Sequence, residues 1–168
     1  LIIPDSVYYG GRYYLVTSIG DYAFTLYHND RFSGGWNITS VTISKYIRSI
    51  YYSAFYGCHN LRKLIWNAQH YSLFDLDAGR NACHLDTLVI GEDVETLPTF
   101  RWRKLYEAGS LFSYTCPKTL IFNAKNAIRT NVNQTNLNSY YWFIGLDSIT
   151  KCSFGNEVTS LPSHFLEG

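Results

Sequence analysis

The chain has 168 residues, and its 14 Lys and Arg nearly balance its 13 Asp and Glu. This balance provides no electrostatic footprint for nucleic acid or for an anionic membrane surface, and no apolar run reaches the roughly 20 residues that cross a bilayer. Aromatic residues make up 17% of the chain and include 15 tyrosines, which suit both a thin core and a contact surface because a large apolar ring carries a polar tip.

The N-terminal segment predicts a strand end, a hairpin and a turn. Leu1-Ile2-Ile3 looks like the tail of an apolar block that recurs further along the chain. An insertion after Val7 places Gly10-Gly11 between aromatic pairs, which predicts a β-hairpin. Residues 21–24 predict a tight turn or a single helical turn, and about eight extra residues then precede Asn37.

The recurring block has apolar residues at its first, fourth and sixth positions, or a close variant of this pattern. Copies lie at 38–43, 61–66, 85–90, 117–122 and 149–154. The second apolar positions align as Val41, Leu64, Leu88, Leu120 and Cys152, at intervals of 23, 24, 32 and 32 residues. A period near 23 residues predicts a solenoid, whose units bury their apolar faces only against their neighbours.

We therefore predict one domain over 1–168, an α/β repeat with the architecture of a leucine-rich repeat solenoid of five to six coils. Each coil is expected to have a main parallel strand, a second short extended stretch near Ile50, Leu97 or Leu161, and a turn or short helix. Neither end looks like a polar capping unit, so the chain is expected to be a fragment of a longer one.

Alternation within the block predicts two rows of outward side chains on the strand face. One row holds three aliphatic residues that could form an exposed apolar stripe, although β-propensity explains them nearly as well. That row is Thr42, Ile65, Val89, Ile121 and Ser153, and the second is Ser40, Lys63, Thr87, Thr119 and Lys151.

The longer intervals contain insertions at one phase of the repeat, so the inserted segments are expected to share an edge, which often binds the ligand. One insertion mixes basic and aromatic residues. A later one contains an Asn-rich stretch, which is followed by four consecutive aromatic residues. Such mixtures form protein hot spots or stacking platforms, but these aromatics could instead pack on the coil. The candidate ligand-binding residues are Trp36, Arg101, Trp102, Arg103, Tyr106, Tyr140, Tyr141 and Trp142.

The cysteines show no zinc-ribbon or zinc-finger spacing. Cys58-His59 and Cys83-His84 recur 25 residues apart, but their registers differ by one residue, so no metal site is predicted. A Cys58–Cys83 disulfide and a buried Cys58 with His59 at the surface both remain open. Cys152 is expected to be buried because it aligns with core leucines.

No catalytic constellation is visible. The chain lacks a nucleophile elbow, a Gly-rich phosphate loop and a zinc-protease motif, and its His and Asp residues share no phase of the repeat. Residues 75–79 are interpreted as a polar loop, because they lack the further acidic ligands of a calcium loop. We predict no enzymatic activity, no cofactor and no metal.

Three segments resemble the BspA-type leucine-rich repeats of Bacteroidetes surface proteins: Ile2 to Val7, Val16 to Phe24 and Ser53 to Cys58. The apolar residue four positions after each block departs from the general leucine-rich repeat consensus and favours this subclass. The resemblance implies a secreted or cell-surface protein that binds a protein or host-matrix ligand and has no shared catalytic residues. A glycan-binding platform and a structural spacer are the alternatives, and no nucleic-acid partner is expected.

Overall fold

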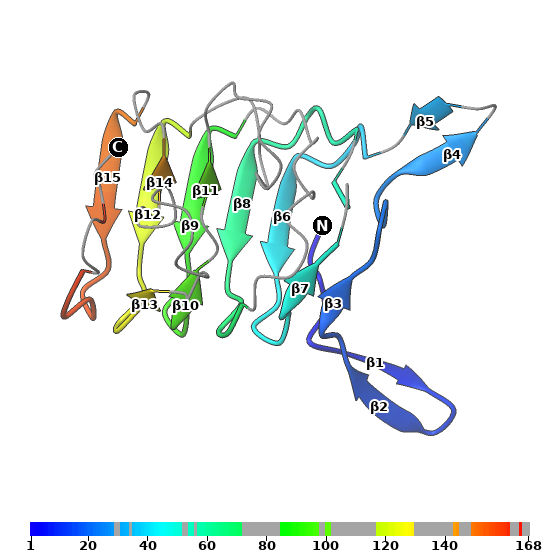
Figure 1. Ribbon diagram of the computed structural model, residues 1–168, viewed down its shortest axis with the longest axis horizontal. Helices are drawn as coiled ribbons and strands as arrows, with labels where there is room; N and C mark the ends of the chain where they lie inside the picture. Colours follow the sequence, from blue (N-terminus) through cyan, green and yellow to red (C-terminus); the bar gives the residue numbers. More distant parts are fainter. Residues whose placement is uncertain are drawn as a thin grey trace, which may run out of the picture.

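The computed structural model describes residues 1–28, 31–33, 35–51, 54–55, 57–71, 85–97, 100–101, 117–129, 143–144, 149–161 and 165. Its main feature is a five-stranded parallel sheet with the strand order β15-β12-β9-β8-β6 (Figure 1). The strands are β6 (Ser40–Ile43), β8 (Lys63–Trp66), β9 (Thr87–Ile90), β12 (Thr119–Phe122) and β15 (Lys151–Phe154).

The strands pair without any offset between equivalent residues of the repeat. Val41 lies opposite Leu64, which in turn lies opposite Leu88. The same row continues through Leu120 to Cys152. This register confirms the alignment of the five blocks that was predicted from their spacing.

A sixth strand position lies beside β6. Ile2 forms a parallel bridge with Thr42. Thr42 N donates to Leu1 O at 2.9 Å, and Ile3 N donates to Thr42 O at 2.9 Å. Residues 1–3 therefore occupy the place of another copy of the block, as predicted.

The second extended stretches form short parallel pairs separate from the main sheet. β3 (Ser18–Ile19) pairs with β7 (Ser49–Ile50), and β10 (Thr96–Leu97) pairs with β13 (Ile128–Arg129). The prediction is confirmed at Ile50 and Leu97. Leu161 is in no strand and is 45% exposed.

Two antiparallel hairpins lie at the N-terminal side of the stack (Figure 1). The predicted one consists of β1 (Ser6–Tyr9) and β2 (Arg12–Leu15). Gly10 and Gly11 have φ angles of 56° and 81°, as expected for a two-residue turn that needs positive φ at both positions. The other hairpin, β4 (Leu26–His28) and β5 (Arg31–Ser33), was not predicted.

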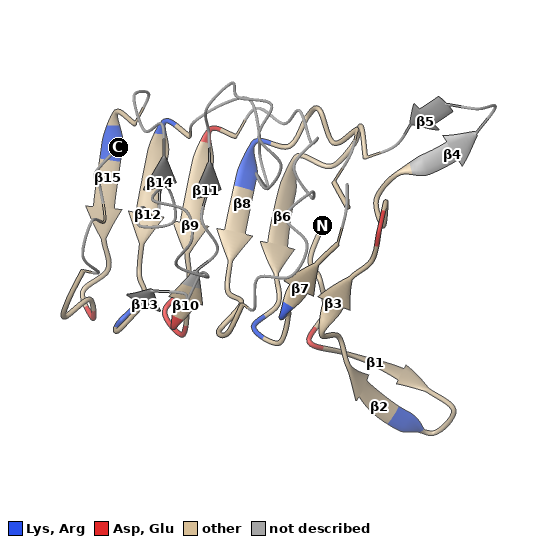
Figure 2. Cartoon of the chain, in the orientation of Figure 1, with Lys and Arg blue, Asp and Glu red and all other residues tan. Residues whose placement is uncertain are grey.

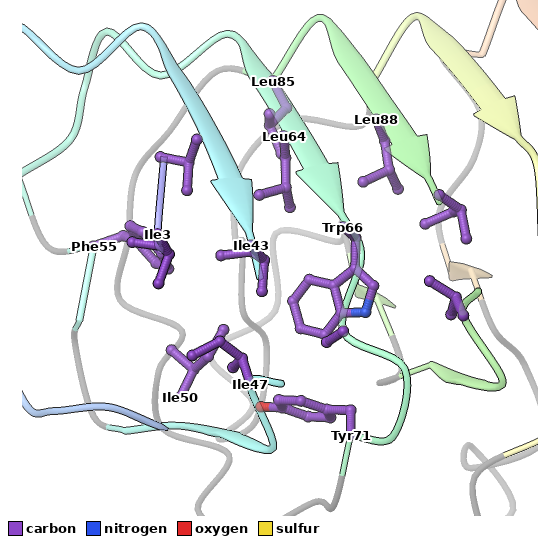
Figure 3. Close-up of a cluster of buried hydrophobic side chains, with 14 of the residues drawn as sticks. Ile3, Ile43, Ile47, Ile50, Phe55, Leu64, Trp66, Tyr71, Leu85 and Leu88 are labelled. Carbon is purple, nitrogen blue, oxygen red and sulfur yellow. The ribbon is translucent and has the colours of Figure 1, made fainter. Parts of the chain in front are cut away.

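The core lies behind the main sheet, where every second strand residue points inward. The inward residues of the four inner strands are all 0% exposed: Val41, Ile43, Leu64, Trp66, Leu88, Ile90, Leu120 and Phe122. Figure 3 shows Trp66 above Tyr71, and their rings meet edge to face at 5.1 Å. Burial of large side chains at each level holds neighbouring repeats together.

The described connections between strands are turns, which is one of the two forms, turns or short helices, that the predicted fold class allowed. None of the described residues is helical, so the observed elements are strands and turns. Residues 21–24 form a turn in which Ala23 N donates to Gly20 O at 3.3 Å and Tyr22 has a φ of 53°. A four-residue connection gains too few hydrogen bonds to offset the cost of helix nucleation. The residues that the structure describes contain no helix that is long and apolar enough to cross a membrane.

The predicted burial of Cys152 is also wrong. Cys152 occupies the predicted register opposite Leu120, yet it is exposed. Within the part of the chain that the structure describes, its strand, β15, pairs with β12 alone, and Phe154 on the same strand is 45% exposed. An inward position in a repeat stack is buried only when neighbours cover it on both sides, and β15 has one such neighbour in the sheet.

Candidate functional site

The outward face of the main sheet carries one continuous row of side chains. We call the outward stripe the row formed by Ile2, Thr42, Ile65, Val89, Ile121 and Ser153, which the pairing of adjacent strands places side by side. Ile2 is 75% exposed, and the other five are partly buried. With strands about 4.8 Å apart, the stripe spans roughly 24 Å. The predicted alternation of inward and outward residues is confirmed by the burial pattern of β6, β8, β9 and β12, but β15 does not show it.

Basic residues gather where the main strands begin, as the blue segments in Figure 2 show. We call this edge the basic rim: Arg62, Lys63, Lys118 and Lys151. Among the described residues it includes one acid, Asp86, whose Oδ2 lies 3.9 Å from Arg62 Nε. Because both of these side chains are about half exposed, the pair adds little to stability. The described part of the rim therefore retains an excess of positive charge.

Acidic residues gather in the turns that follow the main strands (Figure 2). The acids on this acidic rim are Asp5, Glu92, Asp93, Glu95 and Glu157, against the bases Lys45, Arg48 and Lys125. Glu92 Oε2 lies 3.7 Å from Lys125 Nζ. The outward stripe is thus bordered by positive charge on one side and negative charge on the other.

An asparagine of one repeat lies over a glycine of the next repeat at the acidic rim. A methyl group added at Gly91 would overlap Asn67 Oδ1, and one added at Gly155 would approach Asn123 Oδ1 to 2.8 Å. Gly91 N donates to Trp66 O at 2.8 Å, so the two backbones are already close. This packing fixes the turns below the stripe without any bulky side chain there.

Cys58 is a buried free thiol rather than a ligand on the surface. Its side chain is 1% exposed, and burial raises the pKa of the Cys58 thiol to about 11. The neighbouring His59 is exposed, which agrees with the second of the two predicted alternatives. Cys83 and His84 lie outside the described residues. Among the described residues, no three His, Cys, Asp or Glu side chains are placed to hold a metal ion.

Of the predicted aromatic site, the structure describes one side chain. Trp36 is 62% exposed, and its carbonyl accepts a hydrogen bond from Asn60 Nδ2 at 2.7 Å. The two later insertions meet through strands β11 (Phe100–Arg101) and β14 (Phe143–Ile144), where Arg101 lies opposite Ile144. The remaining candidates lie outside the described residues, so this site stays a prediction: Trp102, Arg103, Tyr106, Tyr140, Tyr141 and Trp142.

The β1–β2 hairpin exposes tyrosines that sequence reasoning did not single out. Tyr8, Tyr9, Tyr13 and Tyr14 are 51–78% exposed. The rings of Tyr8 and Tyr13 lie 5.0 Å apart and are tilted by 57°. The signal was the presence of aromatic residues at adjacent positions on both strands, since adjacent strand residues face opposite sides and a projecting hairpin has no core for either side.

Comparison with protein families identifies a BspA type leucine rich repeat region in six copies, with matches over residues 14–72 and 27–168. Searches of curated proteins and of solved structures return no match. Leucine-rich repeats generally act as non-enzymatic modules for protein interaction, and the BspA type is typically secreted or surface-located. Since the matches extend over nearly the whole chain, this protein belongs to the BspA type leucine-rich repeat family.

Proposed function

We propose that this chain is a secreted or cell-surface module that binds a protein or host-matrix ligand through the outward stripe. The observation that carries the proposal is the unbroken, in-register row of outward, partly exposed residues that includes Ile65, Val89 and Ile121. The family supports the same location and a Bacteroidetes source. In this proposal the repeats continue through the remaining segments as a solenoid of five to six coils.

The stripe and its borders have the layout of a protein interface. Such interfaces join an apolar centre to a polar margin that excludes water and sets orientation. Each aliphatic side chain covered by a ligand contributes about 25 cal/mol per Å² of apolar surface removed from water. A polypeptide lying across the strands would meet these side chains in turn, with its acidic groups towards the basic rim.

Two alternatives have less support. A glycan platform calls for exposed rings that lie in one plane, and the described pair Tyr8 and Tyr13 is tilted by 57°. A structural spacer predicts a polar surface without clustering, whereas the outward stripe gathers aliphatic residues in one row. The aromatic insertions are the second candidate contact surface, at which Trp36 is exposed.

The test is an array of purified matrix proteins and polysaccharides probed with the wild-type chain and two sets of variants. The stripe set combines Ile65→Ser, Val89→Ser and Ile121→Ser, and the aromatic set combines Trp36→Ala, Trp102→Ala and Trp142→Ala. We expect a protein hit whose affinity falls at least tenfold in the stripe set. A hit lost only in the aromatic set would move the site to the insertions, and binding to polysaccharides alone would favour the glycan alternative.

A further inference from the structure

The β1–β2 hairpin is a two-stranded sheet without a core of its own. It extends away from the main stack (Figure 1), and among the described residues its sheet contains these two strands and no other. Six of its side chains are large, hydrophobic or aromatic, and exposed: Val7, Tyr8, Tyr9, Tyr13, Tyr14 and Leu15. An isolated two-stranded hairpin is marginally stable in water, so a further strand at either edge would stabilise it.

The hydrogen-bond pattern identifies which backbone groups point outward. Val16 N donates to Asp5 O at 3.0 Å, so residues 5 and 16 form a hydrogen-bonded pair. Bonded and non-bonded pairs alternate along an antiparallel ladder. Ser6 and Leu15 are therefore a non-bonded pair, as are Tyr8 and Tyr13. The N–H and C=O groups of Tyr13 and Leu15 point away from β1, at the outer edge of β2.

The edge of β2 is more open than that of β1. Tyr13 and Leu15 are 77% and 58% exposed, whereas Ser6 on β1 is partly buried near the stack. Natural edge strands usually carry an inward-pointing charge, a proline or a bulge that blocks pairing. Strand β2 contains no proline, and its single charged residue is Arg12, next to the turn.

We propose that the outer edge of β2 pairs with β2 of a second copy of this chain, forming a four-stranded antiparallel sheet around a two-fold axis at Tyr14. In this register the outward groups of Tyr13 bond those of Leu15 in the other copy, and the two Tyr14 residues lie opposite each other. The aromatic rows on both faces of the hairpin then run on into the second hairpin.

Charge complementarity supports the antiparallel arrangement. Arg12 lies at the tip of the hairpin and Asp5 at its base. Directly paired residues share a face of the sheet, and so do residues two apart on one strand. Arg12 pairs with Tyr9, and residues 9, 7 and 5 alternate along one strand, so Arg12 and Asp5 lie on the same face. Antiparallel pairing brings the tip of one hairpin to the base of the other. Each Arg12 then lies opposite Val16 of the other copy. Asp5 of that copy is on the next strand, paired with Val16, so the Asp5 carboxylate is two strand spacings from Arg12 and within reach of its long side chain.

The first test is sedimentation equilibrium of the whole chain from low micromolar to millimolar concentration. We expect reversible growth from a monomer of 19.3 kDa to a dimer, and weak binding because the edge is short. Leu15→Lys, which places a charge on the pairing edge, should raise the dissociation constant at least tenfold. The matched control Val7→Lys lies on β1 at a similar exposure of 48% and should change the constant much less.

Charge exchange tests the register. Arg12→Asp and Asp5→Arg should each weaken the homodimer, whereas an equimolar mixture of the two variants should restore association, because both contacts of the mixed dimer again join an acid and a base. Circular dichroism checks that both variants fold, since Asp5 Oδ1 accepts a hydrogen bond from Ser44 Oγ at 2.7 Å; if Asp5→Arg does not fold, Arg12→Asp alone supplies the test.

A monomer at every concentration would overturn the proposal. So would a dimer that Leu15→Lys leaves unchanged, or a mixture of the charge variants that associates no better than either variant alone. Because Leu15 and Arg12 lie outside the outward stripe and both rims, a failure of their variants leaves the proposed ligand-binding function untouched, and a failure of the stripe variants leaves the hairpin pairing untouched.

Discussion

Truncation of Leu88 to alanine measures how strongly neighbouring repeats hold each other. Leu88 lies in the middle of the five-stranded sheet, between Leu64 and Leu120, and all three are 0% exposed. The substitution removes three buried carbons, at about 0.8 kcal/mol each. Because β9 has a strand on either side, its neighbours cannot move in to fill the cavity that the substitution leaves. The cost of this cavity adds to the loss, for a total of about 3–4 kcal/mol.

The assay is urea denaturation followed by circular dichroism, with the m-value expected to stay constant. Two variants provide matched controls. Val89→Ala alters the outward neighbour on the same strand, and Cys152→Ala alters the equivalent inward position at the exposed edge strand. Each should cost about 1 kcal/mol or less, because partly solvated side chains leave no closed cavity. A loss at Leu88 no larger than that at Val89 would refute the inward assignment of this row.

Four further predictions concern tight contacts at glycines and the thiols of Cys58 and Cys152. Gly35→Ala should destabilise the chain by more than about 1 kcal/mol in the same urea assay, because Gly35 has a φ of 66° and an added methyl group would overlap Cys58 Sγ; a neutral effect would contradict that contact. Gly91→Ala should also destabilise, and Asn67→Ala should relieve part of the loss in a double-mutant cycle, because the added methyl group meets Asn67 Oδ1; strictly additive losses would contradict this packing. With the other two cysteines replaced by serine, Ellman's reagent at pH 8 should modify Cys152 well before Cys58, which is buried and has a pKa of about 11. Since unfolding returns the Cys58 thiol to an ordinary pKa of 9.0, its contribution to stability should be complete below pH 9 and be lost as the pH rises towards 11. Equal reactivity of the two thiols would contradict the burial of Cys58, and so would a stability contribution that grows with pH.

The register of the main sheet could be predicted from the sequence because it depends on a local pattern. The apolar alternation within each block assigns residues such as Leu64 and Ile65 to opposite faces. The spacing between blocks then aligns equivalent strands, down to the pairing of Ile2 with Thr42. Both signals are contained in the block itself and do not depend on what surrounds it.

Features that depend on neighbouring segments were not predictable in this way. Cys152 has the sequence position of a core residue, but its burial depends on neighbouring strands, and among the described residues β15 has such a neighbour on one side, β12. The β4–β5 hairpin left a weak signal in the turn-prone pair Asn29-Asp30, and its strands are three residues each. The sequence predicted the turn of the β1–β2 hairpin. Whether its tyrosines are exposed depends on whether the hairpin packs against the stack or projects from it, which is determined by tertiary packing.

The most direct test of the outward stripe as the binding surface is methyl NMR on the Ile- and Val-labelled chain, titrated with the matrix protein that the array selects. We predict that the methyl signals of Ile65, Val89 and Ile121 shift or broaden as the ligand is added, while those of the inward residues Ile43 and Ile90 stay in place. Saturable binding that leaves the three stripe signals unchanged would contradict the account.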